Sequence, residues 1–425
     1  MKRLSIHFHA NCGSGVPIVA LGVIAVAAGV YHGSSLGAAL GILLLAAPAA
    51  VHWALRRSVA GIRLTRAAPD CAFEGDTVEV KITLHNTSRL PLFLPEVSEV
   101  FTPEIHTQKD VLFPYRVFPG EKVTESYTGD CILPRGVHTL GPLAVSVSDP
   151  LGWFQARRVF SDPRPFKIYP RFAPFGAREK LGGSHSLLLD ERTRFGLGDS
   201  NEFFSVREYR AGDPLRRIHW GLTAHRGFPV IREHARNVSK DLTIVLDLYR
   251  SSYLGTGRGS SLEQAVKITA SLAAHALRRR HRVQVLARGA TSVWVPPRAA
   301  ASHLRAVLDA LVEVKPDGET PLDLLLELEA RRIRPGSTAV IMVSPYLRPS
   351  REFAALGRKL VQRGVRVLLV VFDDSSFKSI YETAPAEPSL DVFLREARGA
   401  GMECITVACG GNLRATFARE EAGRA

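Results

Sequence analysis

The segment from residue 202 to residue 220 gathers many charged side chains around one tryptophan and one histidine. Asp213 before Pro214 is typical of a helix N-cap followed by proline at the first helical position, and Gly227 stands where that helix would end. The sequence therefore predicts a short helix that starts at Asp213. The residues with which this segment could do chemistry are Glu202, Arg207, Tyr209, Gly212, Asp213, Arg216, Arg217, His219 and Trp220.

Two interpretations of this charged segment stay open. In the first, Arg216 or Arg217 pairs with Asp213 or Glu202, and the ion pairs lock a junction between domains. In the second, the charges and Trp220 form a surface that recognises a partner.

The histidines of this region offer the best case for catalysis, since His219, His225 and His234 lie near Asp213 and Glu233. Serine hydrolases need a nucleophile on a strained turn, and the sequence has no G-x-S-x-G elbow. Zinc hydrolysis needs a pattern such as H-E-x-x-H, and nucleotide binding needs GxxxxGK[ST]; both are absent. We therefore expect a protein that is not an enzyme.

Residues 202–213, with Arg217-Ile218-His219-Trp220 and Ala224, resemble the bacterial membrane-protein family called domain of unknown function 58. The resemblance extends upstream to Arg135-Gly136 and residues 148–152, and downstream to residues 242–247. It implies a von Willebrand factor A-like domain coupled to a membrane anchor. It also implies an association with MoxR-type AAA+ ATPases.

An A-like domain implies an ion site made of an Asp-x-Ser-x-Ser loop, a threonine and a second aspartate. Asp247 and Ser251 are retained in the first loop, where Tyr249 replaces the middle serine, and Thr320 matches the threonine. Pro345 stands where the second aspartate is expected. Oxygen ligands suit magnesium, but this degraded site should bind it weakly at best, and we expect no other cofactor.

Two alternatives to a metal follow from the same loops. Asp247 and Thr320 could tie the loops together by hydrogen bonds. Arg250, which adds positive charge beside the site, could occupy the place of the missing cation.

The elements that position these residues are predicted from hydrophobic patterns. Residues 241–425 alternate continuous apolar strands with helices, which indicates an α/β domain with a parallel sheet and helices on both faces. Residues 58–170 alternate in period two, as at Val78, Val80, Ile82 and Leu84, and predict an immunoglobulin-like β-sandwich. Residues 171–240 then form a linker and the signature segment.

The first 57 residues predict a transmembrane hairpin. Residues 4–55 carry no Asp, Glu, Lys or Arg, and two apolar blocks at 16–31 and 36–53 approach the roughly 20 residues that a spanning helix needs. Gly37 and Gly41 supply a seam for close helix packing. A cleaved signal peptide is the alternative for the first block.

The charge distribution and the cysteines indicate the cellular location of the protein. Lys2, Arg3, Arg56 and Arg57 flank the hairpin while its loop is uncharged, so both soluble domains should lie in the cytoplasm beside the inner membrane. The net charge of +14 suits the anionic inner leaflet. The basic residues lack the clustering with aromatics that nucleic-acid binding needs, and the five dispersed cysteines are expected to be reduced thiols.

These expectations favour a non-enzymatic, membrane-anchored scaffold or adaptor that works with a MoxR-type ATPase in the assembly or maturation of a client complex. The alternative is an envelope-biogenesis component that binds membrane or cell-wall assembly partners.

Overall fold

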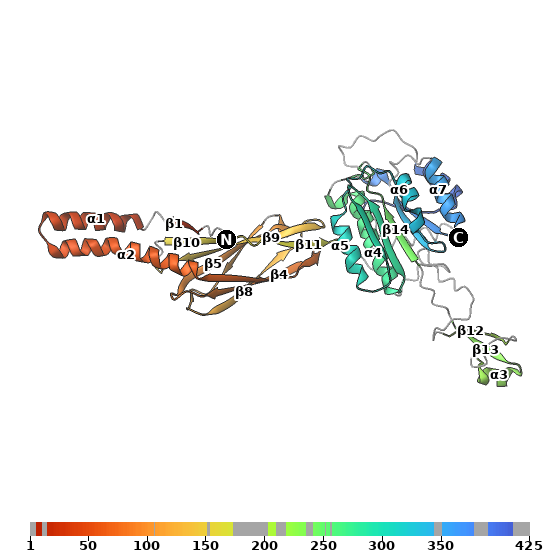
Figure 1. The fold of residues 1–425 in the computed structure, drawn as a ribbon, viewed down its shortest axis with the longest axis horizontal. Helices are drawn as coiled ribbons and strands as arrows, with labels where there is room; N and C mark the ends of the chain where they lie inside the picture. Colours follow the sequence, from red (N-terminus) through yellow and green to blue (C-terminus); the bar gives the residue numbers. More distant parts are fainter. Residues whose placement is uncertain are drawn as a thin grey trace. The chain divides into compact units, whose positions relative to one another are not determined.

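A computed structural model describes residues 6–10, 15–105, 107–150, 154–172, 203–209, 218–234, 241–250, 252–255, 257–343, 351–377 and 390–410. The chain divides into two compact units, Met1–Arg171 and Phe172–Ala425, and each is described by itself (Figure 1).

The first unit begins with a strand rather than with the hairpin. β1 (Ile6–Ala10) pairs antiparallel with β10 (Phe154–Phe160), so these residues complete a β-sheet. These residues were predicted to belong to the hairpin because residues 4–55 are uncharged. The period-two alternation of His7 and His9 with apolar neighbours is the signal of a strand that was missed.

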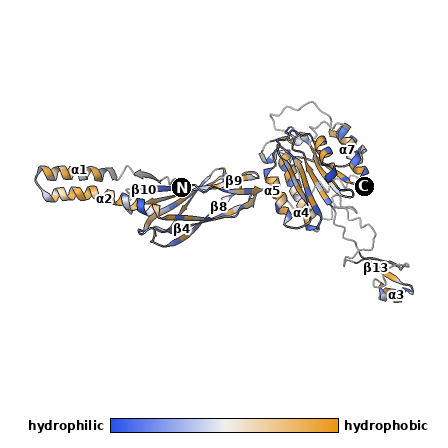
Figure 2. Cartoon of the chain, in the orientation of Figure 1, coloured by the Kyte–Doolittle hydropathy of each residue, from blue (hydrophilic) through white to orange (hydrophobic). Residues whose placement is uncertain are grey.

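Two apolar helices follow, α1 (Gly15–Tyr31) and α2 (Ser35–Ala60), and Figure 2 shows both coloured mainly as hydrophobic. A Cβ added to Gly29 would lie 2.3 Å from the backbone nitrogen of Ala38, and one added to Gly41 would lie 2.5 Å from that of Val26. The helices therefore pack at a distance that only glycine permits, which confirms the predicted small-residue seam at Gly41. Of the described helices, α2 is long and apolar enough to cross a membrane, and Pro17–Tyr31 is a shorter apolar helix.

The end of α2 belongs to the core of the β-structure that follows. Leu55 and Val59 are buried in the same cluster as Ile62, the first residue of β2 (Ile62–Ala67). Arg158 Nη1 donates to the carbonyl oxygens of Val59, Ala60 and Ile62 at 3.1, 2.9 and 3.1 Å. An arginine that satisfies the last carbonyls of a helix fixes the exit of the chain, so the junction between α2 and the sheets is rigid.

Two sheets enclose this core. A three-stranded sheet has the order β2-β4-β8, with β4 at Thr77–Asn86 and β8 at Lys122–Asp130. The second sheet has the order β1-β10-β9-β11-β3, with β5 beside β9 and β6 and β7 beside β5. Its remaining strands are β3 (Cys71–Phe73), β5 (Leu92–Phe101), β6 (Thr107–Leu112), β7 (Arg116–Val117), β9 (Gly136–Ser148) and β11 (Arg164–Tyr169).

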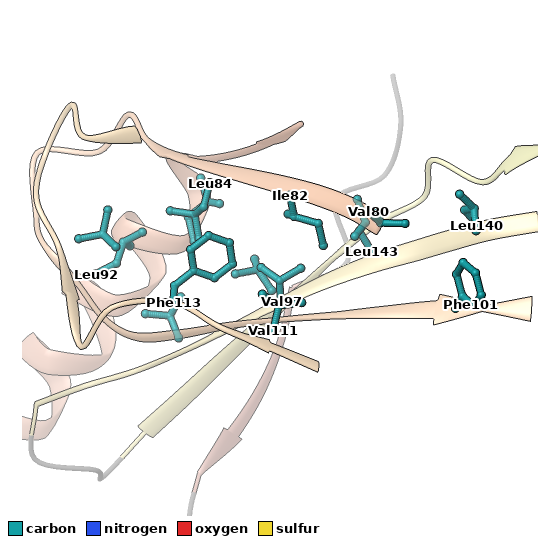
Figure 3. Close-up of a cluster of buried hydrophobic side chains, with 14 of the residues drawn as sticks. Val80, Ile82, Leu84, Leu92, Val97, Phe101, Val111, Phe113, Leu140 and Leu143 are labelled. Carbon is teal, nitrogen blue, oxygen red and sulfur yellow. The ribbon is translucent and has the colours of Figure 1, made fainter. Parts of the chain in front are cut away.

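The buried faces meet between the sheets, where Val80, Ile82 and Leu84 of β4 face Val97 and Phe101 of β5 (Figure 3). The alternating burial of β4 confirms the period-two pattern from which the strand was predicted. The first unit is thus a β-sandwich with an apolar helical hairpin joined to its core.

A charged pair lies inside this sandwich. The side chains of Arg66 and Glu99 are 1% and 0% exposed and form a salt bridge. Tyr127 donates its hydroxyl to Glu99 Oε2 at 2.8 Å, and Arg66 Nη2 donates to the carbonyl of Asp162 at 2.8 Å. Burial, followed by the charge of Glu99, raises the pKa of Tyr127, so the phenol remains the donor in this network.

The second unit contains a six-stranded sheet with the order β16-β15-β14-β17-β18-β19. Its strands are β14 (Asp241–Leu246), β15 (Arg282–Arg288), β16 (Ser292–Arg298), β17 (Thr338–Val343), β18 (Arg366–Phe372) and β19 (Glu403–Val407). Five strands run parallel, and β16 is antiparallel to β15. The wholly parallel sheet expected from the sequence is therefore wrong at one edge. Pro296 and Pro297 lack the N–H groups of a central strand, which is why β16 lies at an edge.

Helices cover this sheet in two groups. α4 (Ser261–Arg278) packs beside α5 (His303–Glu313), whereas α6 (Leu322–Glu329), α7 (Arg351–Gln362) and α9 (Leu390–Gly399) pack in a row. The second row shares a core with Val245, Ile341 and Leu369 of the strands. The predicted α/β layering is confirmed by the described residues.

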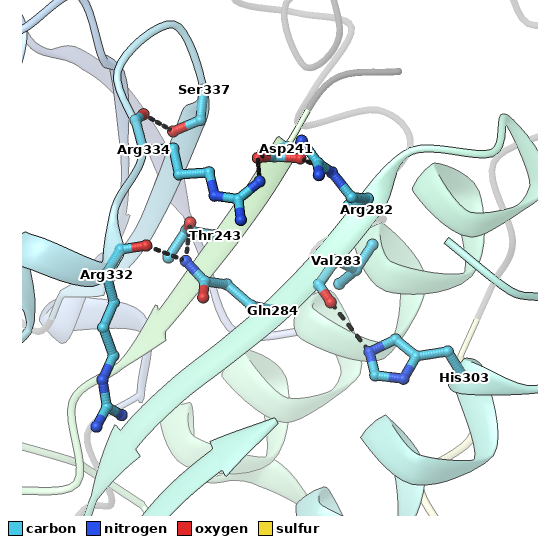
Figure 4. A network of polar contacts seen from close by, with 9 residues as sticks. All are labelled: Asp241, Thr243, Arg282, Val283, Gln284, His303, Arg332, Arg334 and Ser337. Atoms are coloured by element: carbon cyan, nitrogen blue, oxygen red, sulfur yellow. Dashed lines mark hydrogen bonds and ion pairs between the residues drawn. The ribbon is translucent and has the colours of Figure 1, made fainter. Parts of the chain in front are cut away.

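A polar network ties the strands together where β14 and β15 begin (Figure 4). Arg282 holds both carboxylate oxygens of Asp241, and Arg334 approaches the same carboxylate at 3.4 Å. Gln284 Nε2 donates to Thr243 Oγ1 at 2.6 Å within the sheet. The hydrogen-bonding groups of these residues pair with one another, which is typical of a network that stabilises the fold.

Candidate functional site

The carboxyl ends of the strands, opposite the Asp241 network, are where a six-stranded sheet with this strand order binds ligands. From β14 the chain adds β15 and β16 on one side and then β17, β18 and β19 on the other. The order therefore reverses between β14 and β17. In open α/β sheets, ligands bind beyond the carboxyl ends of the strands at such a switch point. Asp247 is the first residue after β14.

Asp247 is 1% exposed and holds the loop that follows the strand. Its Oδ1 accepts from the Tyr249 N–H at 2.9 Å, and its carbonyl accepts from the Tyr253 hydroxyl. Among the described residues, its Oδ2 has no hydrogen-bond partner. Leaving such a group buried without any partner costs about 1–3 kcal/mol, and the Ser252 hydroxyl, which lowers the pKa of Asp247, offsets part of this cost.

The same burial changes the acidity of this carboxyl group. Desolvation raises the pKa of Asp247 from 3.8 to about 6, and the charge of Asp323 adds to the rise. The hydroxyl of Ser252 and the backbone N–H of Tyr249 oppose it. A carboxyl group with this pKa is partly protonated in mildly acidic solution and ionised above it.

Ser252 is the residue that sequence reasoning missed at this site. It is 1% exposed, and within the described part of the chain its Oγ forms no hydrogen bond of normal geometry. The spacing of the Asp-x-Ser-x-Ser pattern selected Ser251, which lies outside the described residues. The doubled serine was the signal available, but pattern spacing alone cannot choose between neighbours.

The loops at this end are joined through their backbones. Tyr249 forms a parallel bridge with Gly318, whose N–H donates to the Leu248 carbonyl at 2.9 Å and whose carbonyl accepts from the Arg250 N–H at 3.0 Å. A Cβ on Gly318 would lie 2.6 Å from the carbonyl oxygen of Arg288, so glycine is required for this approach. Thr320 follows two residues later and is half-buried.

Both alternatives to a metal are corrected by this geometry. Arg250 is largely exposed and its Nη1 lies 3.7 Å from Glu319 Oε1, so it does not stand in for a cation at Asp247. The carboxylate of Asp247 takes its hydrogen bond from Tyr249 and not from Thr320.

The described part of the predicted ion site offers the carboxylate of Asp247 and the half-buried Thr320, whereas Ser251 lies outside the described residues. Magnesium binds through one or two carboxylates in an octahedral set of oxygens. In the part of the chain that the structure describes, no group of three His, Cys, Asp or Glu side chains could hold a metal. Pro345, in the third loop, lies outside the described residues.

The signature segment folds as a two-stranded hairpin with a short helix. β12 (Phe203–Glu208) pairs antiparallel with β13 (Val230–His234), and α3 (Trp220–Arg226) precedes β13. Ile218 bridges to Ile231, and both are buried. These contacts give the segment a small apolar core.

Asp213 and Pro214, where the helix was predicted to start, lie outside the described residues. The structure places Ile218 in an extended bridge, and His219 is the N-cap of α3, with its Nδ1 accepting from the Leu222 N–H at 3.3 Å. The predicted end is confirmed, since Gly227 caps the helix with a φ of 76°.

The signature side chains divide into those that are described and those that are not. Trp220 is 67% exposed and Tyr209, half-buried, donates its N–H to the Pro229 carbonyl at 2.9 Å. The backbone of Arg207 pairs with Ile231. The predicted ion-pair network falls outside the described residues, which do not include Glu202, Gly212, Asp213, Arg216 and Arg217.

Comparisons with known proteins find similarity over part of the chain. Uncharacterized protein YeaD of Bacillus subtilis (strain 168) is 24% identical over 260 residues, which are 58% of this chain and 61% of that protein. Uncharacterized protein Mb1516 of Mycobacterium bovis is 27% identical over 170 residues, 37% of this chain and 53% of that protein. The chain therefore spans less than two thirds of the length of these relatives.

Among solved structures, the CARDB domain of PF1109 from Pyrococcus furiosus aligns with 26% of this chain and 94% of its own, at 8% identity and a TM-score of 0.18. The PKD domain of an M14-like peptidase from a Thermoplasmatales archaeon aligns at 16% identity and a TM-score of 0.16, over 25% of this chain and 89% of its own. A family profile described as "Protein of unknown function DUF58" matches residues 205–377. That match includes most of the signature segment and the strands from β14 to β18 of the six-stranded sheet.

Proposed function

We propose that this protein is a non-enzymatic adaptor, anchored in the cytoplasmic membrane by its helical hairpin, whose second unit is a von Willebrand A-like domain that binds a protein partner. The parallel sheet with one antiparallel edge strand and a loop site at its switch point supports this assignment. The described residues offer no metal cluster, and His219 serves as a helix cap.

The observation that carries the proposal is the exposure of Trp220. The side chain is 67% exposed at the start of α3, and α3 buries none of its residues. Phe228, which follows the helix, is 39% exposed. Tryptophan is enriched among the residues that dominate binding energy at protein interfaces. A recognition surface therefore explains Trp220 better than the buttress interpretation, in which the ring would be packed.

The proposed partner is a MoxR-type AAA+ ATPase, which acts with this adaptor on a client complex. The resemblance of the signature segment to its family supplies this partner. A cytoplasmic ATPase requires both soluble units on the cytoplasmic side, which agrees with the basic residues that flank the uncharged hairpin, Lys2, Arg3, Arg56 and Arg57. The same basic residues would hold anionic lipid of the inner leaflet.

Copurification after mild detergent extraction tests the proposal. The full chain is compared with Trp220→Ala and with Trp294→Ala, a matched control because Trp294 is also exposed, at 49%, and stacks against Arg332 of the same unit. We expect the wild type and Trp294→Ala to recover a hexameric ATPase, and Trp220→Ala to lose it. Recovery of envelope-assembly enzymes alone would contradict the proposal and favour a role in envelope biogenesis.

A further inference from the structure

One end of the β-sandwich lies at the same height along the α2 axis as the end of the apolar part of that helix. The His52 ring of α2 packs against Phe154 of β10, with ring centroids 5.7 Å apart. The neighbouring position of β10 pairs with Ser148 of β9, which also pairs with Phe93 of β5. Phe93 contacts Tyr115 at 6.1 Å between ring centroids. This chain of contacts sets the loops at residues 86–94 and 113–121 at the level of His52.

Helix length places that level at a membrane surface. α1 has 17 residues, and the part of α2 that precedes His52 is equally long. At 1.5 Å per residue such a helix spans about 25 Å, and the hydrocarbon core of a bilayer is about 30 Å thick. A hairpin of this length uses all of its apolar residues to cross the bilayer. The loops at the level of His52 then reach the headgroup layer.

The side chains on these loops are unusually apolar for a free surface. Leu94, Tyr115 and Phe118 are 52%, 59% and 50% exposed. Their backbones are fixed, since the Leu94 N–H donates to the Tyr115 carbonyl at 2.8 Å and the Phe118 N–H donates to Glu121 at 2.7 Å. Leu94 also has a φ of 45°, a strained conformation that persists in proteins mainly where function requires it.

Basic side chains accompany these apolar ones. Arg89 and Arg116 are exposed on the same loops, and the Arg116 guanidinium lies 4.2 Å from the centroid of the Phe118 ring. On α2, Trp53 is 62% exposed and Arg57 lies 5.8 Å from its ring. Aromatic rings and arginines at one level are typical of a membrane interface, where the rings enter the headgroup region and the cations meet lipid phosphates.

We propose that a tip surface, defined as Leu94, Tyr115 and Phe118 with Arg89 and Arg116, rests on the anionic headgroup layer of the membrane that α2 crosses. This inference rests on the proposed membrane anchoring and adds a second point of attachment. Since Leu55 and Val59 join α2 rigidly to the core of the sandwich, the two attachments together fix the orientation of the sandwich against the bilayer.

Fluorescence quenching in vesicles tests the tip surface in the full chain. A bimane probe is placed on Pro119→Cys, beside Phe118, or on Val137→Cys as the matched control at the other end of the sandwich. β4 connects the two ends with 10 residues, and an extended strand of that length spans about 33 Å. The half-buried Cys71 and the exposed Cys409 are replaced by serine, whereas Cys131 and Cys404 are buried and retained. Cys12, which lies outside the described residues, is replaced by serine as well. The vesicles carry a nitroxide on the lipid headgroup.

We expect the probe at position 119 to lose emission and the probe at position 137 to keep it. The loss should increase when phosphatidylglycerol is added to phosphatidylcholine, and Arg89→Gln with Arg116→Gln should remove that increase. Tyr115→Ser with Phe118→Ser should restore emission at position 119. Equal emission from both probes in protein that floats with the vesicles would overturn the tip surface alone. Protein that does not float with vesicles would overturn the proposed anchoring as well.

Discussion

Replacing Asp247 with asparagine should stabilise the second unit at neutral pH. Burial raises the pKa of this carboxyl from 3.8 to about 6, so the folded state holds the proton more tightly than the unfolded chain does. The stability that proton binding at Asp247 contributes to the folded state is therefore fully present below pH 3.8. It is lost as the pH rises through about 6. A difference of about 2 pKa units corresponds to about 3 kcal/mol of unfolding free energy above that range. Asparagine removes this cost and retains an acceptor for the Tyr249 N–H.

The assay is thermal unfolding of the full chain in mild detergent between pH 4 and pH 8. The gain in melting temperature of Asp247→Asn over the wild type should be small near pH 4 and reach about 6 °C or more at pH 7, since 1 kcal/mol shifts a unit of this size by about 2–4 °C. Asp317→Asn is the control, because Asp317 is exposed on a neighbouring loop and accepts from the Ala290 N–H. A loss of stability in Asp247→Asn at every pH would refute the reasoning, because it would mean that the buried carboxylate has a positive partner.

Three further predictions follow from the same structure. A few millimolar magnesium should not raise the melting temperature relative to chelator, since a ligand at its dissociation constant contributes about 0.4 kcal/mol; a clear rise that Asp247→Ala abolishes would restore the ion site. Arg66→Met should lower the unfolding free energy of the sandwich by about 3–5 kcal/mol because it leaves Glu99 buried and unpaired, whereas Lys81→Ala, which breaks an exposed pair, should cost less than about 1 kcal/mol in a denaturant titration. Trp220→Ala should change stability by less than about 0.5 kcal/mol, because the ring is exposed; a larger loss in the same titration would favour the buttress interpretation.

Long periodic segments of the fold were predictable from sequence. The alternation of apolar strands and helices over residues 241–425 predicted the α/β layering, to which the largely buried strands β17 and β19 belong. Short or atypical elements were not. β1 was hidden in an uncharged run beside the hairpin, and β16 was missed because Pro296 and Pro297 obscure a strand pattern that only an edge position permits.

The candidate site was predictable only in part, because its partners come from distant segments. Asp247 follows a strand whose position at the switch point needs the strand order, and the burial of Ser252 depends on the folded loop. In the signature segment, Gly227 fixed the end of α3 through its backbone conformation. The start of α3 depends on the pairing of Ile218 with Ile231, a contact that local sequence does not reveal.

Topology is the measurement that tests the central claim most directly, because an adaptor of a cytoplasmic ATPase must keep both soluble units inside the cell. Ser34 is the N-cap of α2 in the loop of the hairpin, and Ser88 contacts Gly61 at the base of the sandwich. Single cysteines at these positions are treated with a membrane-impermeant thiol reagent on intact cells, in a background without Cys12, Cys71 and Cys409. The account predicts labelling at position 34 and none at position 88. Labelling at position 88 and none at position 34 would contradict it, since the sandwich would then lie outside the cytoplasm.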